Sequence, residues 1–136
     1  SLHRAAQADP GNWHILNTMG VAYEQGGISE RARQYFRDAL ALSPGEPSIM
    51  SNLALSHALS GEAETAERML REAMARPGAE AAVRQNLALV IALQGRFDEA
   101  EDMARFDVTP AMAQANMAYI RSMLTSRRSY DSLRAD

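Results

Sequence analysis

Apolar and small residues recur along this chain with a fixed spacing of 34 residues. The recurrence has three columns: a glycine, an alanine, and a large apolar residue followed at once by a small one. The members of these columns are Gly27, Gly61 and Gly95; Ala32, Ala66 and Ala100; and the pairs Met19-Gly20, Leu53-Ala54 and Leu87-Ala88. Several columns in phase at this period are typical of a helix–turn–helix unit that is repeated along a stack.

Each column has a mechanical role in a helical hairpin. The small residue at positions 20, 54 and 88 lets the two helices cross closely, and the alanine column on the second helix faces the first helix. The glycines follow the first helix, where a left-handed C-cap favours a residue without a Cβ atom. Phe36 and Leu70 are expected to fill the space between hairpins, while Pro44 and Pro77 end the second helices.

The pattern therefore predicts an all-α fold, a right-handed α-α superhelix with three full helical hairpins in a single domain. The domain is expected to span residues 1–126, with hairpins at residues 12–44, 46–77 and 80–107. The third hairpin is expected to be about one turn short, because the word that begins at Asn116 echoes the one at Asn86 at a spacing of 30.

Both ends of the chain carry further signals. Three residues near the start lie 34 positions before matching residues of the first hairpin. The pairs are Leu2 and Phe36, Ala5 and Ala39, and Pro10 and Pro44. Residues 1–10 are therefore interpreted as a remnant helix of a preceding hairpin. Thr109 and Pro110 are typical of a helix start, so a helix at residues 109–126 is expected to cap the stack, followed by a polar tail at residues 127–136.

The first helices of such a stack line its inner, concave side, and helical spacing indicates which residues face it. The residues interpreted as a partner-binding groove are His14, Asn17, Thr18, Val21, Ser51, Asn52, Leu55, Gln85, Asn86, Leu89, Asn116 and Tyr119. Within this set, the polar column is Thr18, Asn52, Asn86 and Asn116, and the apolar column is Val21, Leu55, Leu89 and Tyr119. An amide offers both a donor and an acceptor, so this groove suits an extended partner with small or apolar side chains.

The same residues have a structural alternative. An Asn on a first helix can hydrogen-bond a neighbouring helix, and Leu55 and Leu89 can be partly covered by adjacent hairpins. The groove also lacks a cluster of cations that would hold a C-terminal carboxylate. Arg84 is the nearby cation, and Glu80 lies one turn earlier as an expected ion-pair partner.

Composition excludes several other functions. The chain is 46% hydrophobic and 23% charged with a net charge of −3, which indicates a globular domain and gives no argument for nucleic acid. It has no Cys, and its three His residues are widely separated, so neither a metal site nor a cofactor is expected. Nucleophilic triads and glycine-rich phosphate loops are absent from the sequence. An enzymatic role is therefore not expected.

The repeat columns resemble the tetratricopeptide repeat (TPR) family across essentially the whole chain. A narrower resemblance is carried by residues 83–101, with the words Arg84-Gln85-Asn86-Leu87-Ala88-Leu89 and Gly95-Arg96-Phe97-Asp98-Glu99-Ala100, and by the helix that contains Asn116-Met117-Ala118-Tyr119. These segments resemble the tetratricopeptide protein of the Tad/Flp pilus assembly system (TadD-like).

The resemblance implies a non-catalytic protein-interaction module that takes part in pilus assembly or secretion. It also implies a bacterial outer-membrane lipoprotein that faces the periplasm, with its lipidated Cys upstream of this segment. Two alternatives stay open at this point. One is a generic cytoplasmic tetratricopeptide adaptor, and the other is a self-assembling module that forms homo-oligomers through an open end at residues 1–10.

Overall fold

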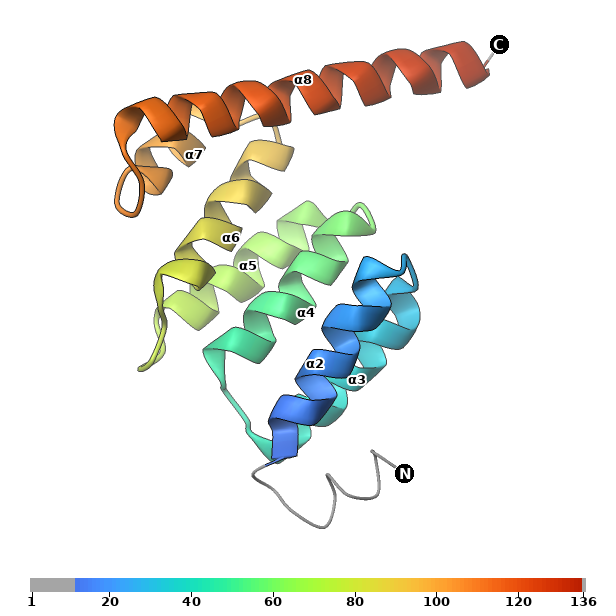
Figure 1. Ribbon diagram of the computed structural model, residues 1–136, viewed down its shortest axis with the longest axis vertical. Coiled ribbons are helices and arrows are strands. Elements are labelled where there is room, and N and C mark those ends of the chain that lie inside the picture. The colour runs from blue at the N-terminus through green and yellow to red at the C-terminus, as the bar shows by residue number, and fades with distance from the viewer. Residues whose placement is uncertain (1–11, 136) are drawn as a thin grey trace.

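The computed structural model describes the backbone of residues 12–135 and the side chains of residues 12–126. Its helices form antiparallel pairs that lie side by side, with one longer helix across the end of the stack (Figure 1). The predicted all-α fold with three helical hairpins is confirmed. The remnant helix predicted at residues 1–10 lies outside the described residues.

The three hairpins follow one another in sequence order. They are α2 (Trp13–Gln25) with α3 (Ser29–Leu42), α4 (Pro47–Leu59) with α5 (Ala63–Met74), and α6 (Ala81–Leu93) with α7 (Phe97–Ala104). The first helices also contact one another, α2 with α4 and α4 with α6. We call the side of the stack formed by α2, α4 and α6 the inner face.

Small residues set the close approach of the two helices within a hairpin. A Cβ atom added at Gly20 would overlap the ring of Phe36, which reaches across from α3 and is 1% exposed. The predicted alanine column, Ala32, Ala66 and Ala100, is completely buried. The glycines that follow the first helices, Gly27, Gly61 and Gly95, have φ values between +79° and +88°, as the left-handed C-cap requires.

The third hairpin ends early. Its second helix α7 has 8 residues, whereas α3 has 14 and α5 has 12. The chain then turns into α8 (Pro110–Ala135). Thr109 caps its start, since the Thr109 Oγ1 accepts a hydrogen bond of 3.2 Å from the Met112 N–H. Ala113 and Met117 of α8 are buried against α6 and α7.

The extent of the last helix differs from the prediction. We expected it to end at residue 126 and a polar tail to follow, but α8 continues to Ala135 and projects beyond the stack in Figure 1. Residues 127–135 contain neither Gly nor Pro. A polar composition was therefore a poor guide to the helix end, because Arg, Leu and Ala favour helix and nothing in this segment interrupts it.

The overlap between position 20 and Phe36 gives a test of the packing. Gly20→Ala should lower the free energy of unfolding by about 1–3 kcal/mol through overpacking, although the same exchange in an open helix is stabilising. The matched control is Gly26→Ala, where φ is −80° and the added Cβ would meet only ordinary contacts from 3.5 Å. Urea unfolding of both variants measures the difference, and a stabilised Gly20→Ala protein would contradict the close crossing.

Candidate functional site

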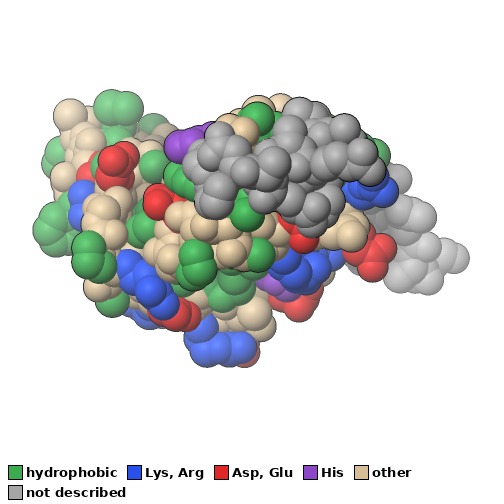
Figure 2. All heavy atoms as spheres, turned by 90° about the horizontal axis from the view of Figure 1, so that it is seen from below, with side chains coloured by type: hydrophobic (Ala, Val, Ile, Leu, Met, Phe, Trp, Pro, Cys, Tyr) green, Lys and Arg blue, Asp and Glu red, His purple; other side chains and the backbone are tan. Residues whose placement is uncertain are grey.

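Charged residues are segregated between the two sides of the stack. α4 contains no Asp, Glu, Lys or Arg, and α2 and α6 contain one each, Glu24 and Arg84. By contrast, α3 and α5 contain five each and α7 contains four. Both signs interleave on the face seen in Figure 2, where no large area of one sign is visible. A ligand on the inner face would therefore meet almost only neutral groups.

Hydrogen bonds between side chains join the first helices across the inner face. The Asn52 Nδ2 donates to the Asn17 Oδ1 at 3.0 Å, and the Asn86 Nδ2 donates to the Ser51 Oγ at 2.7 Å. The two bonds are equivalent, because each joins residues 35 positions apart. Asn52 and Asn86 therefore each use one amide N–H to bond a neighbouring helix, as the structural alternative predicts. Both side chains are nevertheless partly exposed.

This series of bonds stops at the last helix. By the same register, the next pair would be Gln85 of α6 and Asn116 of α8, with the spacing shortened by the short α7. No hydrogen bond joins these two residues among the described side chains, and both are exposed. Their amide groups remain available to a ligand.

A hollow of about 400 Å³ lies between Gln85 and Asn116. Its walls come from α6, from the end of α7 and from α8, and none of them carries a charged side chain. The lining residues are Gln85, Ala88, Leu89, Ala104, Val108, Asn116, Met117, Tyr119, Ile120 and Met123. We call this the α6–α8 hollow. It combines an apolar interior with a few polar groups at the edge, which is the usual composition of a binding pocket.

The structure brings four of the predicted groove residues together here: Gln85, Leu89, Asn116 and Tyr119 line the α6–α8 hollow. The Tyr119 side chain is 68% exposed, which is high for a large apolar residue. Sequence reasoning missed the other walls, including Val108 and Ile120. The shortened third hairpin was the available signal, since it displaces α8 from the regular spacing.

The remaining predicted residues lie elsewhere on the inner face. His14 and Thr18 are exposed, and the His14 ring stacks on Trp13 with centroids 3.6 Å apart. Val21 and Leu55 are partly buried and pack against the core. Ser51 was predicted to face a partner, but it is 3% exposed and its hydroxyl is engaged by Asn86. Its role is to hold α6 to α4.

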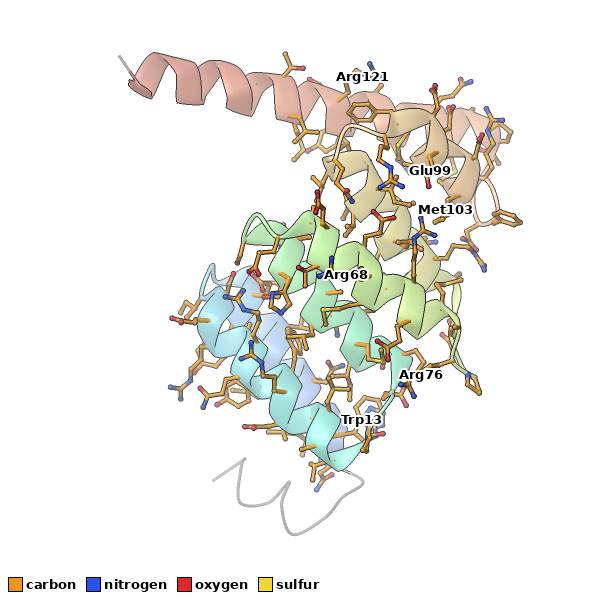
Figure 3. The ribbon with its side chains drawn as sticks, turned by 180° about the vertical axis from the view of Figure 1, so that it is seen from behind. Trp13, Arg68, Arg76, Glu99, Met103 and Arg121 are labelled. Atoms are coloured by element: carbon orange, nitrogen blue, oxygen red, sulfur yellow. The ribbon has the colours of Figure 1, made fainter. Side chains whose placement is uncertain are left out.

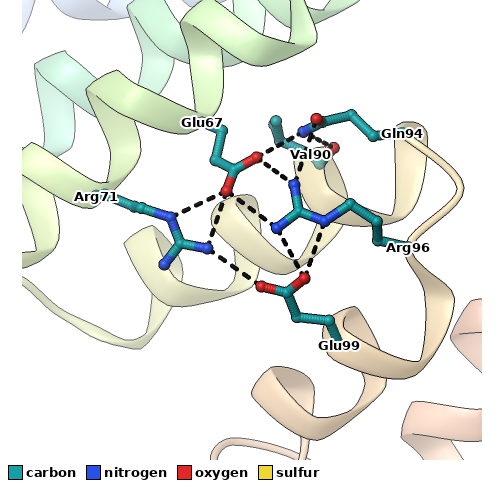
Figure 4. Close-up of polar contacts among 6 residues, drawn as sticks. All are labelled: Glu67, Arg71, Val90, Gln94, Arg96 and Glu99. Atoms are coloured by element: carbon teal, nitrogen blue, oxygen red, sulfur yellow. Dashed lines mark hydrogen bonds and ion pairs between the residues drawn. The ribbon is translucent and has the colours of Figure 1, made fainter.

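An ionic cluster fixes the third hairpin to the second (Figure 4). Glu67 of α5 binds the Arg96 Nη1 at 2.6 Å and also accepts hydrogen bonds from Gln94 and Arg71. Glu99 bridges the two arginines. The hydrogen bond from Arg96, helped by those from Gln94 and Arg71, lowers the pKa of Glu67 to about 2. These contacts hold the α6 side of the hollow in place.

Two further contacts position α7 and α8. The Arg84 guanidinium forms two hydrogen bonds of 2.7 Å with the Asp107 carboxylate, which lowers the pKa of Asp107. This pair replaces the expected one between Arg84 and Glu80, because the turn after α7 brings Asp107 back over α6. Arg121 of α8 lies 4.2 Å from the centre of the Phe97 ring at the start of α7 (Figure 3).

These observations define an α-solenoid of helical hairpins with a nearly uncharged inner face. Tetratricopeptide repeat models match residues 48–76 and 81–105, so the second and third hairpins are tetratricopeptide repeats and the fold is a tetratricopeptide solenoid. Repeats of this class serve protein–protein interaction. The comparison with curated proteins gave no match. Among the described residues, no group of acidic, His or Cys side chains is arranged to hold a metal ion, and no helix is suited to span a membrane.

The Glu67 cluster predicts a pH dependence of stability. Because its folded pKa of about 2 lies below the unfolded value near 4.3, the unfolded state binds the proton first as pH falls. The stabilisation is therefore complete above about pH 4.5 and is lost between that pH and about 2. Glu67→Gln should remove part of this dependence in urea unfolding at pH 7, 4.5 and 2.5. Glu72→Gln, at an exposed pair with Arg76, is the control and should change stability by less than about 0.5 kcal/mol.

Proposed function

We propose that this protein binds an extended, uncharged segment of a partner protein along its inner face, with an apolar side chain of that segment seated in the α6–α8 hollow. The observation that carries the proposal is the pair of unengaged amides, Gln85 and Asn116, on either side of an apolar hollow.

The apolar interior supplies affinity. A side chain in the hollow would be removed from water against Leu89, Val108 and Ile120, and burial contributes about 25 cal/mol per Å² of apolar surface. Met117 and Met123 also line the hollow. Methionine adapts its shape readily, so the hollow suits several apolar side chains rather than one.

The amides supply orientation. Each amide can donate to a carbonyl and accept from an N–H group, so Gln85 and Asn116 can hold a peptide unit on each side of the anchoring side chain. Peptide binding of this kind recognises the backbone of an extended chain and the size of one of its side chains.

The absence of charge supplies selectivity. An acidic or basic side chain placed on the described inner face would lose water without gaining an ionic partner, because α4 has no charged residue and Arg84 is engaged by Asp107. That loss is costly, so charged segments are rejected.

The first test selects ligands without assuming their identity. Panning a random peptide display library on the protein should enrich uncharged peptides with one large apolar residue, and calorimetry then measures the affinity of a selected peptide. Leu89→Glu, which places a charge in the hollow, should weaken binding at least tenfold. Ile28→Glu, at an exposed apolar residue outside the inner face, should leave affinity unchanged. Enrichment of acidic or basic peptides, or equal binding by Leu89→Glu, would exclude this site.

The second test separates the binding amides from the structural ones. Replacing Gln85 and Asn116 together by Ala should weaken binding of the selected peptide by about 1–3 kcal/mol with little change in unfolding free energy. Replacing Asn52 and Asn86 by Ala should instead lower the unfolding free energy by about 0.5–1.5 kcal/mol per site, because bonds between helices are lost. The reverse assignment of the two effects would place the ligand on the central part of the inner face.

We further propose that the partner belongs to a Tad/Flp-type pilus assembly or secretion system and that the full protein acts in the bacterial periplasm, anchored to the outer membrane. The resemblance carried by residues 83–101 and by the Asn116-Met117-Ala118-Tyr119 helix supports this assignment. A generic cytoplasmic adaptor is the alternative. Binding assays with purified pilin and secretin subunits of the same organism test it, and cell fractionation of the full protein tests the location. A cytoplasmic protein that binds neither subunit would retain the peptide-binding role and exclude the pilus role.

A further inference from the structure

A second hollow lies on another side of α6, away from the inner face. Its volume is about 370 Å³, and it is lined by Arg71 and Met74 of α5, Arg84 and Leu87 of α6, Met103 of α7 and Phe106 of the following turn. Figure 3 views the molecule from this side and shows Met103 on α7. We call it the Phe106 hollow.

The hollow exists because the repeat pattern changes at one position. One repeat earlier, the residue equivalent to Arg84 is Met50, which is 7% exposed and fills the core. Arg84 cannot fill the same space, since its guanidinium is drawn out to Asp107 at 2.7 Å. The partly exposed Met74 and Met103 side chains therefore keep an open apolar surface, beneath which Leu87 is buried.

Phe106 stands at the edge of this hollow without filling it. Its side chain is 79% exposed, the largest exposure among the large apolar residues of the described chain. The ring lies 5.7 Å from the Arg84 guanidinium, which is itself fixed by Asp107. A cation held over a ring stabilises its orientation. The Phe106 ring, which we call the knob, is thus held in an exposed orientation. Less side-chain conformational entropy is therefore lost when the ring binds another surface.

A knob beside a hollow on one surface is self-complementary. A twofold axis between them would place the Phe106 ring of each copy in the hollow of the other, so that both exposed apolar surfaces are covered at once. The volume is ample, since a cavity of about 150 Å³ accommodates a benzene ring. The charges also permit the approach of two identical surfaces, because Arg71 is paired with Glu67 and Glu99, and Arg84 with Asp107.

We propose that two copies of this chain associate through reciprocal insertion of Phe106 into the hollow formed by Met74, Leu87 and Met103. The contact is a weak dimer, because it is centred on one ring per copy and covers a small area. The surface is separate from the α6–α8 hollow, so a dimer would present two peptide-binding sites, and failure of one proposal leaves the other standing.

Sedimentation equilibrium of the whole chain, from about 10 μM to about 1 mM, tests the association. The average mass should rise from 14.9 kDa toward twice that value. Phe106→Asp should keep the protein monomeric over the whole range, and folding should be unaffected because the side chain is exposed. The matched control is Ile28→Asp, at another exposed apolar residue, which should associate like the unchanged protein.

A mixing experiment tests the reciprocal geometry. Phe106→Ala removes the knob but keeps the part of the hollow formed by Met74, Leu87 and Met103, and Met74→Glu places a charge in the hollow but keeps the knob. Each variant alone forms neither insertion, whereas an equimolar mixture forms one of the two. The mixture should therefore associate at least tenfold more tightly than either variant alone.

Three results would overturn the proposal. One is an unchanged protein that stays monomeric at about 1 mM, as expected if the hollow instead receives a side chain of a different protein. Another is association that persists in Phe106→Asp, which would place the contact elsewhere. The third is a mixture that associates no better than its components while both variants keep the circular dichroism spectrum of the unchanged protein.

Discussion

The register between successive hairpins is the constraint on which the rest of this structure depends. Each hairpin is bound to the next by a contact that recurs one repeat later, first the bond from Asn52 to Asn17 and then the bond from Asn86 to Ser51. The second helices follow the same rule with different chemistry. Arg33 donates to Ser56 and Ser60 of the next hairpin, and Glu67, one repeat later, binds Gln94 and Arg96. The residue at this repeated position thus contacts the next hairpin in both repeats, although its charge changes from positive at Arg33 to negative at Glu67.

This register also separates the two sides of the molecule. The ionic contacts between the second and third hairpins join α5 to α7 and to the residue before it, where water reduces the cost of keeping charges. The inner helices associate through neutral amides and hydroxyls, which can be partly buried without an ionic partner. As a result the inner face is neutral, and the selectivity that we propose for it is a consequence of how the hairpins stack.

The regular part of the fold could be predicted from the sequence because its causes are local and repeated. Gly20 and the buried alanines indicate where the two helices of a hairpin cross, and the glycines with positive φ indicate where the first helices end. The site was predicted only in part. Helical spacing placed Gln85, Leu89, Asn116 and Tyr119 on the concave side of the stack, and the structure brings these four residues together around the α6–α8 hollow, the proposed binding site.

Other features depend on contacts that the 34-residue repeat does not predict. Ser51 appeared available by spacing, but a partner 35 residues later covers it. Arg84 was assigned to Glu80, one turn earlier in the sequence, whereas the turn after α7 supplies Asp107. The walls at Val108 and Ile120 likewise follow from where α8 comes to rest. That position is a tertiary outcome of the short α7 and cannot be read from the repeat columns alone.

The ligand surfaces of a repeat protein are expected where the repetition fails. In a regular array each apolar surface is covered by the next hairpin, and each inter-helix amide is engaged by the hairpin before it. Here α7 ends after 8 residues, and the third hairpin departs from the pattern on both of its sides. On the inner side α8 does not reach Gln85, and on the other side Arg84 leaves the space that Met50 fills one repeat earlier. The shortened α7 therefore accounts for the α6–α8 hollow, and the Arg84 side chain, which is held by Asp107 of the turn that follows α7, accounts for the Phe106 hollow.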